Sequence, residues 1–323
     1  MSDSSPVEPV DLLDRRLLFV TGKGGVGKTT VAAALAVVAA GRGKKVLVGE
    51  VDAKGNLADF YSVPPTEFTP REVQPNLWAM TLDPEESLKE YLTLQLKLPM
   101  MARIGPLARI FEFVATAAPG VKEVLTVGKF LWETDRKDWD LVIVDAVATG
   151  HIVGQLGAPQ AINDLVHVGL IRSQTDWMVD ILRDPARTGL CIVATPEEMP
   201  VNETIELAAR LRAETEVDLA AVVVNRVLPE LFGRGEEEVF ERLESPDGRA
   251  ALSGVLGVAA DPIVDAARLA VTLRRTRAEH LDRLRAEVPS HLPLLFVPEL
   301  FLRGHGLRST RLVAEALGAE LGY

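Results

Sequence analysis

Residues 22–30 read Gly22-Lys23-Gly24-Gly25-Val26-Gly27-Lys28-Thr29-Thr30 and satisfy the pattern GxxxxGK(S/T). The segment follows an apolar run that predicts a strand at 16–21, and it opens a predicted helix at 29–42, which is the context that this pattern requires. Glycines let successive backbone N–H groups turn toward a phosphate, and the helix N-terminus adds partial positive charge. The sequence therefore predicts a phosphate-binding loop between a buried strand and a helix.

Three side chains at or near this loop have the chemistry that ATP and Mg²⁺ require. Lys28 is expected to reach the β- and γ-phosphates, and the Thr29 hydroxyl is expected to ligate Mg²⁺. Asp145 ends the apolar run 141–144. A carboxylate at the end of a strand beside the loop can hold the metal through water. ATP and Mg²⁺ are accordingly the expected cofactors.

Short aliphatic runs recur along most of the chain and alternate with amphipathic stretches. Strands of a parallel sheet that is covered on both faces have this composition, so we predict an α/β fold with a doubly wound, mainly parallel sheet. The further predicted strands are 45–51, 77–82, 141–145, 190–195, 219–225 and 294–297.

Two stretches, at about 84–133 and 151–186, are helical throughout and break the alternation. We interpret them as helical insertions in a single phosphate-loop ATPase domain that spans residues 16–323. Residues 1–15 are predicted to be a flexible N-terminal tail. The insertions have two interpretations: they form a lobe that binds a client or partner, or they only cover the edge of the sheet.

The composition excludes several classes of protein. A net charge of −11 disfavours nonspecific binding to nucleic acid and to anionic membranes. The first ten residues lack the features of a signal peptide, and the longest apolar run, Val31 to Ala40, is too short to span a bilayer. The single cysteine, Cys191, excludes an intrachain disulfide and a zinc site of several cysteines within one chain. A cytoplasmic protein without direct membrane insertion is expected.

Three segments carry a resemblance to a known family. The loop GKGGVGKTT, with its second lysine Lys23, resembles the signature of the deviant-Walker-A ATPases. The segment 52–59 resembles the switch I motif DPAHxLSD of the arsenite-pump ATPases, a family that includes the ATPases that target tail-anchored proteins. It departs from that motif at Ala53 and Gly55. The segment 145–151 is similar to the switch II motif DTAPTGH of the same family.

The resemblance implies roles for individual residues. It implies that Lys23 crosses a dimer interface to the nucleotide of the other subunit and that Asp52 orients or activates the attacking water. It further implies an adenine site at Asn225, whose amide can both donate and accept hydrogen bonds, and at Pro298, which follows the last strand. The residues that match the two switch motifs elsewhere are Asp59, Thr149, Gly150 and His151.

The same residues argue against the two well-known tasks of this family. Capture of trivalent arsenic needs three thiolates, and this chain has one. Targeting of tail-anchored proteins needs a paired-cysteine zinc site and a methionine-rich groove, whereas only six methionines are present. We therefore expect an ATP-hydrolysing dimeric switch, formed with a second copy or with a paralogue. The helical lobe would bind a protein client that the sequence does not identify.

Three alternatives stay open at this point. The altered switch motifs suggest a nucleotide-gated scaffold with little turnover. A partition-type positioning ATPase would need a basic amphipathic terminal helix, and the segment Leu307 to Tyr323 gives only a weak signal of that kind. A ligase or synthetase of the same fold is the third.

Overall fold

The fold is seen in a computed structural model that describes residues 11–51, 56–94, 120–165, 170–230, 234–302, 304 and 306–323. Asp52, the expected catalytic residue, lies outside the described residues. The same is true of residues 95–119 in the first predicted insertion and of residues 1–10 in the predicted tail.

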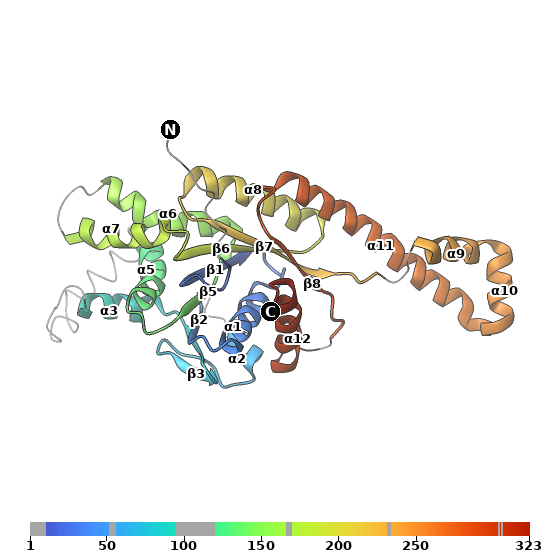
Figure 1. Cartoon of the computed structure of the whole chain (residues 1–323), viewed down its shortest axis with the longest axis horizontal. Coiled ribbons are helices and arrows are strands. Elements are labelled where there is room, and N and C mark those ends of the chain that lie inside the picture. Colours follow the sequence, from blue (N-terminus) through green and yellow to red (C-terminus); the bar gives the residue numbers. More distant parts are fainter. Residues whose placement is uncertain are drawn as a thin grey trace.

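One eight-stranded sheet forms the centre of the molecule, in the order β3-β4-β2-β5-β1-β6-β7-β8 (Figure 1). Neighbouring strands pair in parallel except for β3, which pairs antiparallel with β4 at the edge. The strands are β1 Leu17–Gly22, β2 Val46–Glu50, β3 Arg71–Gln74, β4 Leu77–Thr81, β5 Leu141–Ala148, β6 Thr188–Ala194, β7 Leu219–Val227 and β8 Leu294–Pro298. The predicted α/β fold with a mainly parallel sheet is confirmed.

The sequence did not predict β3, and it placed the ends of two strands too early. β3 is a partly exposed edge strand of sequence Arg71-Glu72-Val73-Gln74, which gives no apolar signal. β5 does not end at Asp145, because the following residues keep pairing with β1 as far as Gly22 opposite Ala148. β7 likewise continues beyond Asn225 to Val227, which pairs with Pro298 of β8.

Helices cover both faces of the sheet, as the aliphatic strands require. Side chains alternate along β1, so that Leu18 and Val20 enter one core while Leu17 and Phe19 enter the other. The first core lies under α1, α2 and α12, and the second lies under α5–α8 and part of α11. The helices are α1 Lys28–Gly41, α2 Asn56–Tyr61, α3 Pro84–Leu94, α5 Val121–Asp135, α6 Thr149–Leu165, α7 Leu170–Arg183, α8 Glu198–Glu214, α9 Arg234–Glu244, α10 Pro246–Leu256, α11 Ala260–Glu287 and α12 Leu307–Glu320.

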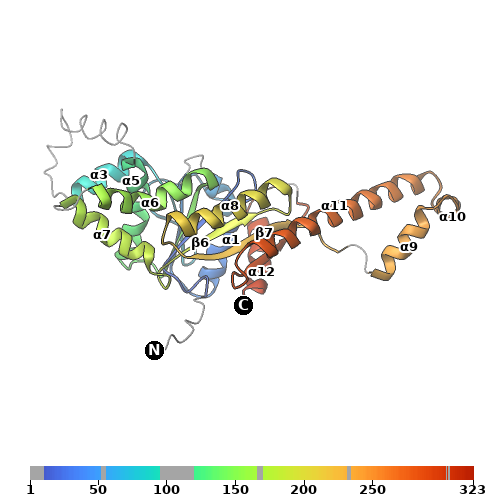
Figure 2. The same ribbon diagram turned by 90° about the horizontal axis from the view of Figure 1, so that it is seen from above.

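Helices gather at both ends of the long axis of the molecule (Figure 2). At one end lie α3 and α5, from the predicted helical stretch 84–133, beside α6 and α7, from the stretch 151–186. At the other end α9, α10 and the outer part of α11 project away from the sheet. The sequence did not predict this projecting arm between β7 and β8, because no motif in residues 234–287 distinguishes it from helices that cover the sheet.

Among the described residues, one helical stretch is long and apolar enough to cross a bilayer by length and composition, Pro246–Glu287 in the arm. Only 11% of its most apolar 18-residue window is buried. The stretch is not one straight helix, because a 3₁₀ turn at Gly257–Ala259 separates α10 from α11 and the chain reverses there (Figure 1).

Gly49 of β2 gives a test of the packing on the second face. A Cβ at this position would lie 2.1 Å from Cε1 of Phe130, a ring of α5 that is fully buried. Gly49→Ala is expected to lower the free energy of unfolding by about 1–3 kcal/mol, because a dense core cannot make room for the methyl group without strain. Urea unfolding of the purified protein measures this change.

Gly41→Ala is the matched control, since a Cβ there meets nothing within 4 Å at the end of α1. It should leave the free energy of unfolding unchanged or raise it by up to about 1 kcal/mol, the difference in helix propensity. Equal effects of the two substitutions would contradict the packing of Phe130 on Gly49.

Candidate nucleotide site

The loop predicted to bind phosphate connects β1 to α1 at the carboxyl edge of the sheet. Two of its glycines are required by close approach and by conformation. A Cβ on Gly22, whose φ is +154°, would lie 2.2 Å from the carbonyl oxygen of Val193 in β6. A Cβ on Gly27, whose φ is +96°, would lie 2.3 Å from Nδ2 of Asn225. The backbone of the loop therefore lies directly against the neighbouring strands.

The structure brings together the two residues that the sequence assigned to the metal. Thr29, in the first turn of α1, donates a hydrogen bond from Oγ1 to Oδ2 of Asp145 at 2.6 Å. Asp145 lies on β5 with only 6% of its surface exposed. A hydroxyl and a carboxylate are the hard oxygen donors that Mg²⁺ prefers, so this pair fits the metal that the loop implies.

The described residues contain no group of three or more His, Cys, Asp or Glu side chains arranged to hold a metal ion. This does not conflict with magnesium, because proteins usually hold Mg²⁺ through one or two side chains, while phosphates and waters complete its octahedron. A zinc site built from several protein ligands is absent from the same described residues.

Both lysines of the loop make contacts within the chain. Lys28 donates from Nζ to the carbonyl oxygen of Lys23 at 3.3 Å. The Lys23 ammonium forms an ion pair with Oε1 of Glu203 on α8. The other oxygen of that carboxylate accepts a hydrogen bond from Oγ1 of Thr149 at 3.0 Å. The hydrogen bond from Lys23 lowers the pKa of Glu203, with a further contribution from Thr149, so the carboxylate is ionised at neutral pH.

Asn225 also lies at the loop. It is 6% exposed on β7, and its Nδ2 donates to the carbonyl oxygen of Val26 at 2.8 Å. Its Oδ1 accepts a hydrogen bond from the backbone N–H of Arg226 at 3.0 Å. An amide offers two donors and two acceptor lone pairs, so half of its capacity is left for the base edge that we assigned to it. Pro298 is an exposed residue at the end of β8, opposite Val227.

The residues of the switch motifs divide between two helices. Thr149, Gly150 and His151 form the first turn of α6, where the His151 side chain is exposed. Asp59 is exposed on α2. The structure thus brings Thr149 to the loop through Glu203, whereas it shows no contact that joins His151 or Asp59 to the loop among the described residues.

Sequence reasoning missed Glu50, a buried acid beside the site. It ends β2 with 2% of its surface exposed and lies opposite Asp145 in the parallel register. Its Oε2 accepts a hydrogen bond from the N–H of Leu57 at 3.4 Å. A glutamate that closes an otherwise aliphatic strand was the signal that could have identified it. Glu50 thereby links β2 to the start of α2, just after the segment that contains Asp52.

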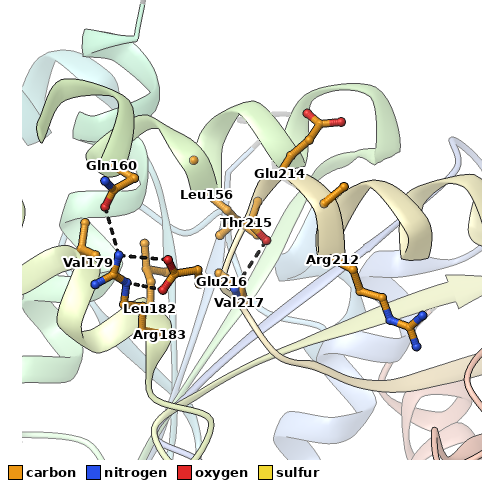
Figure 3. A pocket seen from close by; sticks show the side chains of 12 residues that line it. Leu156, Gln160, Val179, Leu182, Arg183, Arg212, Glu214, Thr215, Glu216 and Val217 are labelled. Carbon is orange, nitrogen blue, oxygen red and sulfur yellow. Dashed lines mark hydrogen bonds and ion pairs between the residues drawn. The ribbon is translucent and has the colours of Figure 1, made fainter. Parts of the chain in front are cut away.

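A separate cavity of about 290 Å³ has none of the loop residues in its lining, which Figure 3 shows. It is lined by residues of α6 and α7, by the last turn of α8 and by the segment 215–217 that leads into β7 at the amino edge of the sheet. Arg183 spans one side, with bonds to Glu216 at 3.0 Å and to Gln160 at 3.4 Å. Because the phosphate loop is at the carboxyl edge, this cavity is not part of the candidate nucleotide site.

Comparison of the sequence with known proteins also points to an ATPase. The model of a family described as anion-transporting ATPase matches residues 15–180 and 168–244. The chain belongs to this family. The sequence resemblance to the arsenite-pump ATPases is thereby confirmed.

Several relatives in this ATPase family match most of the chain. The ATPase BagA of Mycobacterium tuberculosis is 33% identical over 315 residues, which cover 91% of this chain and 88% of that protein. A putative arsenical pump-driving ATPase of Halobacterium salinarum is 27% identical, over 76% of this chain and 42% of its own length. The ATPase GET3 of Podospora anserina is 27% identical, over 70% of this chain and 79% of its own.

The contact between Asn225 and the loop can be tested without nucleotide. Asn225→Ala leaves the buried carbonyl of Val26 without this donor, so the free energy of unfolding should fall by about 1–3 kcal/mol. Gln160→Ala removes two solvent-exposed hydrogen bonds, one to Asp164 at 2.8 Å and one from Arg183 at 3.4 Å, and should change the free energy of unfolding by less than about 0.5 kcal/mol. Chemical unfolding of both variants in nucleotide-free buffer measures these free energies. An Asn225→Ala protein with the wild-type free energy of unfolding would refute the contact.

Proposed function

We propose that the protein binds ATP with Mg²⁺ on residues 22–30 and hydrolyses the bond between the β- and γ-phosphates, which gives ADP and phosphate. The observation that carries this proposal is the 2.6 Å contact between Thr29 and Asp145 at the start of α1, beside the loop. It joins the two expected magnesium ligands in a member of an ATPase family. When bound, Mg²⁺ would neutralise charge on the β- and γ-phosphates.

In this proposal, different residues of the chain bind the phosphates, the metal, the attacking water and the adenine. The N–H groups of the loop and the ammonium of Lys28 bind the phosphates, while Thr29 and Asp145 hold the metal. Asp52, which comes two positions after the end of β2 in the sequence, orients the attacking water and accepts its proton. Asn225 and Pro298 bind the adenine, since both lie near the carboxyl ends of their strands, on the same edge of the sheet as the loop.

The working unit is proposed to be a dimer, formed with a second copy or with a paralogue. The chain carries one phosphate loop, and Lys23 is the residue that would reach the nucleotide of the other subunit. There its ammonium would stabilise the charge that develops during phosphoryl transfer, as an arginine finger does in trans. ATP would close the dimer and hydrolysis would open it.

The helical lobe is proposed to bind a protein client. Helix α6 starts at Thr149 in the switch II motif and packs against α5 and α7, so a shift of its first turn reaches the lobe directly. Residues 16–323 would then form one ATPase domain that follows the segment 1–15, of which Leu12 and Leu13 pack in the first core. A cytoplasmic location is part of the proposal, which includes neither nucleic acid nor direct membrane insertion.

Two other candidate functions differ from this one in particular features. The scaffold alternative rests on Ala53 and Gly55 in the switch I motif and predicts binding without turnover. The positioning alternative needs a free amphipathic terminal helix. The C-terminal helix α12 instead packs against α1 and buries Val313, Ala314 and Leu317 in the first core, which disfavours that alternative.

Turnover is the direct test of the proposed reaction. Lys28→Ala should weaken ATP binding, because it removes a cation from the phosphates. Asp52→Asn should bind ATP normally and slow hydrolysis by ~10²-fold or more, since it keeps the size of the side chain but loses the base. Phosphate release and fluorescent-nucleotide binding measure the two effects separately.

Asp140→Asn makes the same substitution at the opposite edge of the sheet, where Asp140 accepts a bond from the N–H of Lys45. This control should hydrolyse ATP at the wild-type rate. An Asp52→Asn protein with the wild-type rate would refute the catalytic assignment. A wild-type protein that binds ATP without releasing phosphate would favour the scaffold.

Arsenite is not expected to stimulate hydrolysis. Soft arsenic requires three thiolates, and even a homodimer would bring two, one from each chain. Cys191 lies on β6 with no exposed surface, and burial raises the pKa of its thiol to about 12, so the thiolate is not available at neutral pH. Steady-state rates with and without arsenite should agree. Severalfold activation that Cys191→Ser abolishes would show that this expectation is wrong.

A further inference from the structure

One carboxylate connects three segments of the candidate site. Glu203 on α8 pairs with Lys23 of the loop through Oε1 and accepts a hydrogen bond from Thr149 through Oε2. Lys23 follows β1, Thr149 follows β5, and α8 follows β6, so the three segments come from adjacent strands. Neither oxygen of Glu203 is left without a partner from another segment.

Helix α8 provides a fixed base for this carboxylate. Residues on either side of Glu203 are fully or nearly fully buried, with Val201 at 0% and Thr204 at 2% exposed. Leu207 and Leu211 continue the same buried face against the second core. The side chain of Glu203 itself is 29% exposed, and that of Lys23 is 31% exposed. The ion pair is therefore partly exposed, but its carboxylate is attached to a helix that is anchored in the second core.

We propose that Glu203 is a positioning residue that sets the place of the Lys23 ammonium and of the first turn of α6 together. A lysine side chain with no partner samples many rotamers. Fixing it in one rotamer at the second subunit costs conformational entropy. A charged hydrogen bond from Lys23 to a carboxylate on a fixed helix restricts the lysine to few rotamers before the dimer forms. The proposal rests on the proposed function, since it names a further residue for the same reaction.

The shared carboxylate also couples the loop to switch II. A movement of Thr149 changes the hydrogen bonding of Oε2, and the same carboxylate holds Lys23 through Oε1. The position of Lys23 thus depends on the state of the segment that begins the helical lobe. The sequence motifs place Lys23 and Thr149 in separate roles, and only the fold shows that Glu203 joins them.

The test compares Glu203→Gln, which keeps the shape and loses the charge, with Glu206→Gln in the next turn of α8, where the side chain is exposed. Glu203→Gln should lower kcat for ATP by about tenfold and change KM less than twofold, because it acts on Lys23 rather than on ground-state binding. Glu206→Gln should keep the wild-type kcat. Glu203→Asp, which keeps the charge, should recover part of the loss.

Non-additivity separates positioning from a general loss of structure. The double variant Lys23→Ala with Glu203→Gln should be slower than Lys23→Ala alone by much less than the factor that Glu203→Gln costs in the wild type, because most of the effect of Glu203 on kcat passes through Lys23. A kcat of Glu203→Gln that equals or exceeds the wild-type value would overturn the proposal. A further loss in the double variant that multiplies the single losses would overturn it too.

Hydrogen exchange of the nucleotide-free protein gives a readout that does not need turnover. Peptides that cover residues 20–27 and 146–153 should exchange severalfold faster in Glu203→Gln than in the wild type or in Glu206→Gln. If the wild-type protein hydrolyses no ATP, the proposed function fails while this comparison still decides the role of Glu203. Unchanged exchange in both peptides would overturn the positioning role.

Discussion

Strand β1 is hydrogen-bonded on both sides, to β5 and to β6, and is buried along its whole length. The candidate site depends on this placement. The phosphate loop continues from the carboxyl end of β1, while Asp145 comes from β5 on one side and Glu203 from the helix after β6 on the other. In open parallel sheets the carboxyl ends of such central strands are where ligands bind. A loop attached to an edge strand would lack one set of these neighbours.

The loop has no room to move away from its neighbours at two points. Gly22 lies against the backbone of β6, and Gly27 lies against Asn225 of β7. Both approaches are so close that a Cβ at either glycine would clash. The approach at Gly27 accompanies the bond between Asn225 and the carbonyl of Val26. Residues from β1, β5, β6 and β7 therefore meet at one site, although Val26 and Asn225, for example, lie 199 positions apart in the chain.

Much of this arrangement could be predicted because the strands are short, aliphatic and separated by helices. Seven of the eight strands and the loop followed from composition, period and the phosphate-binding pattern. Strand β3 could not be predicted, because a polar edge strand is specified by its partner β4 rather than by its own residues. The early ends given to β5 and β7 had a similar cause, since pairing with β1 and β8 extends them.

The site was less predictable than the fold. Thr29 and Asp145 meet as expected, because each follows from a local pattern. The contact of Lys23 with Glu203 joins residues 180 positions apart, so no local pattern pairs the two side chains. The buried Glu50 was visible as an acid in an aliphatic strand, but its partner Leu57 follows only from the folded chain.

The same contacts give the helices at the two ends different relations to the site. Helix α6 begins beside the loop and continues into the lobe with α5 and α7, so nucleotide chemistry and the lobe share one element. The arm of α9, α10 and outer α11 connects to the sheet through β7 and β8, and it exposes Val255 of α10 and Val258 of the turn between α10 and α11. Under the proposed function, a change of nucleotide would therefore act on the lobe first.

The central claim is that Lys23 of one chain completes the site of another, and a mixture of two inactive variants tests it most directly. In a dimer of Lys23→Ala with Asp52→Asn, one site would have both residues intact and the other would have neither. Random pairing of equal amounts should restore about a quarter of the wild-type rate, because half the dimers would be mixed and each would have one working site. No recovery from variants that still dimerise with ATP would contradict the claim.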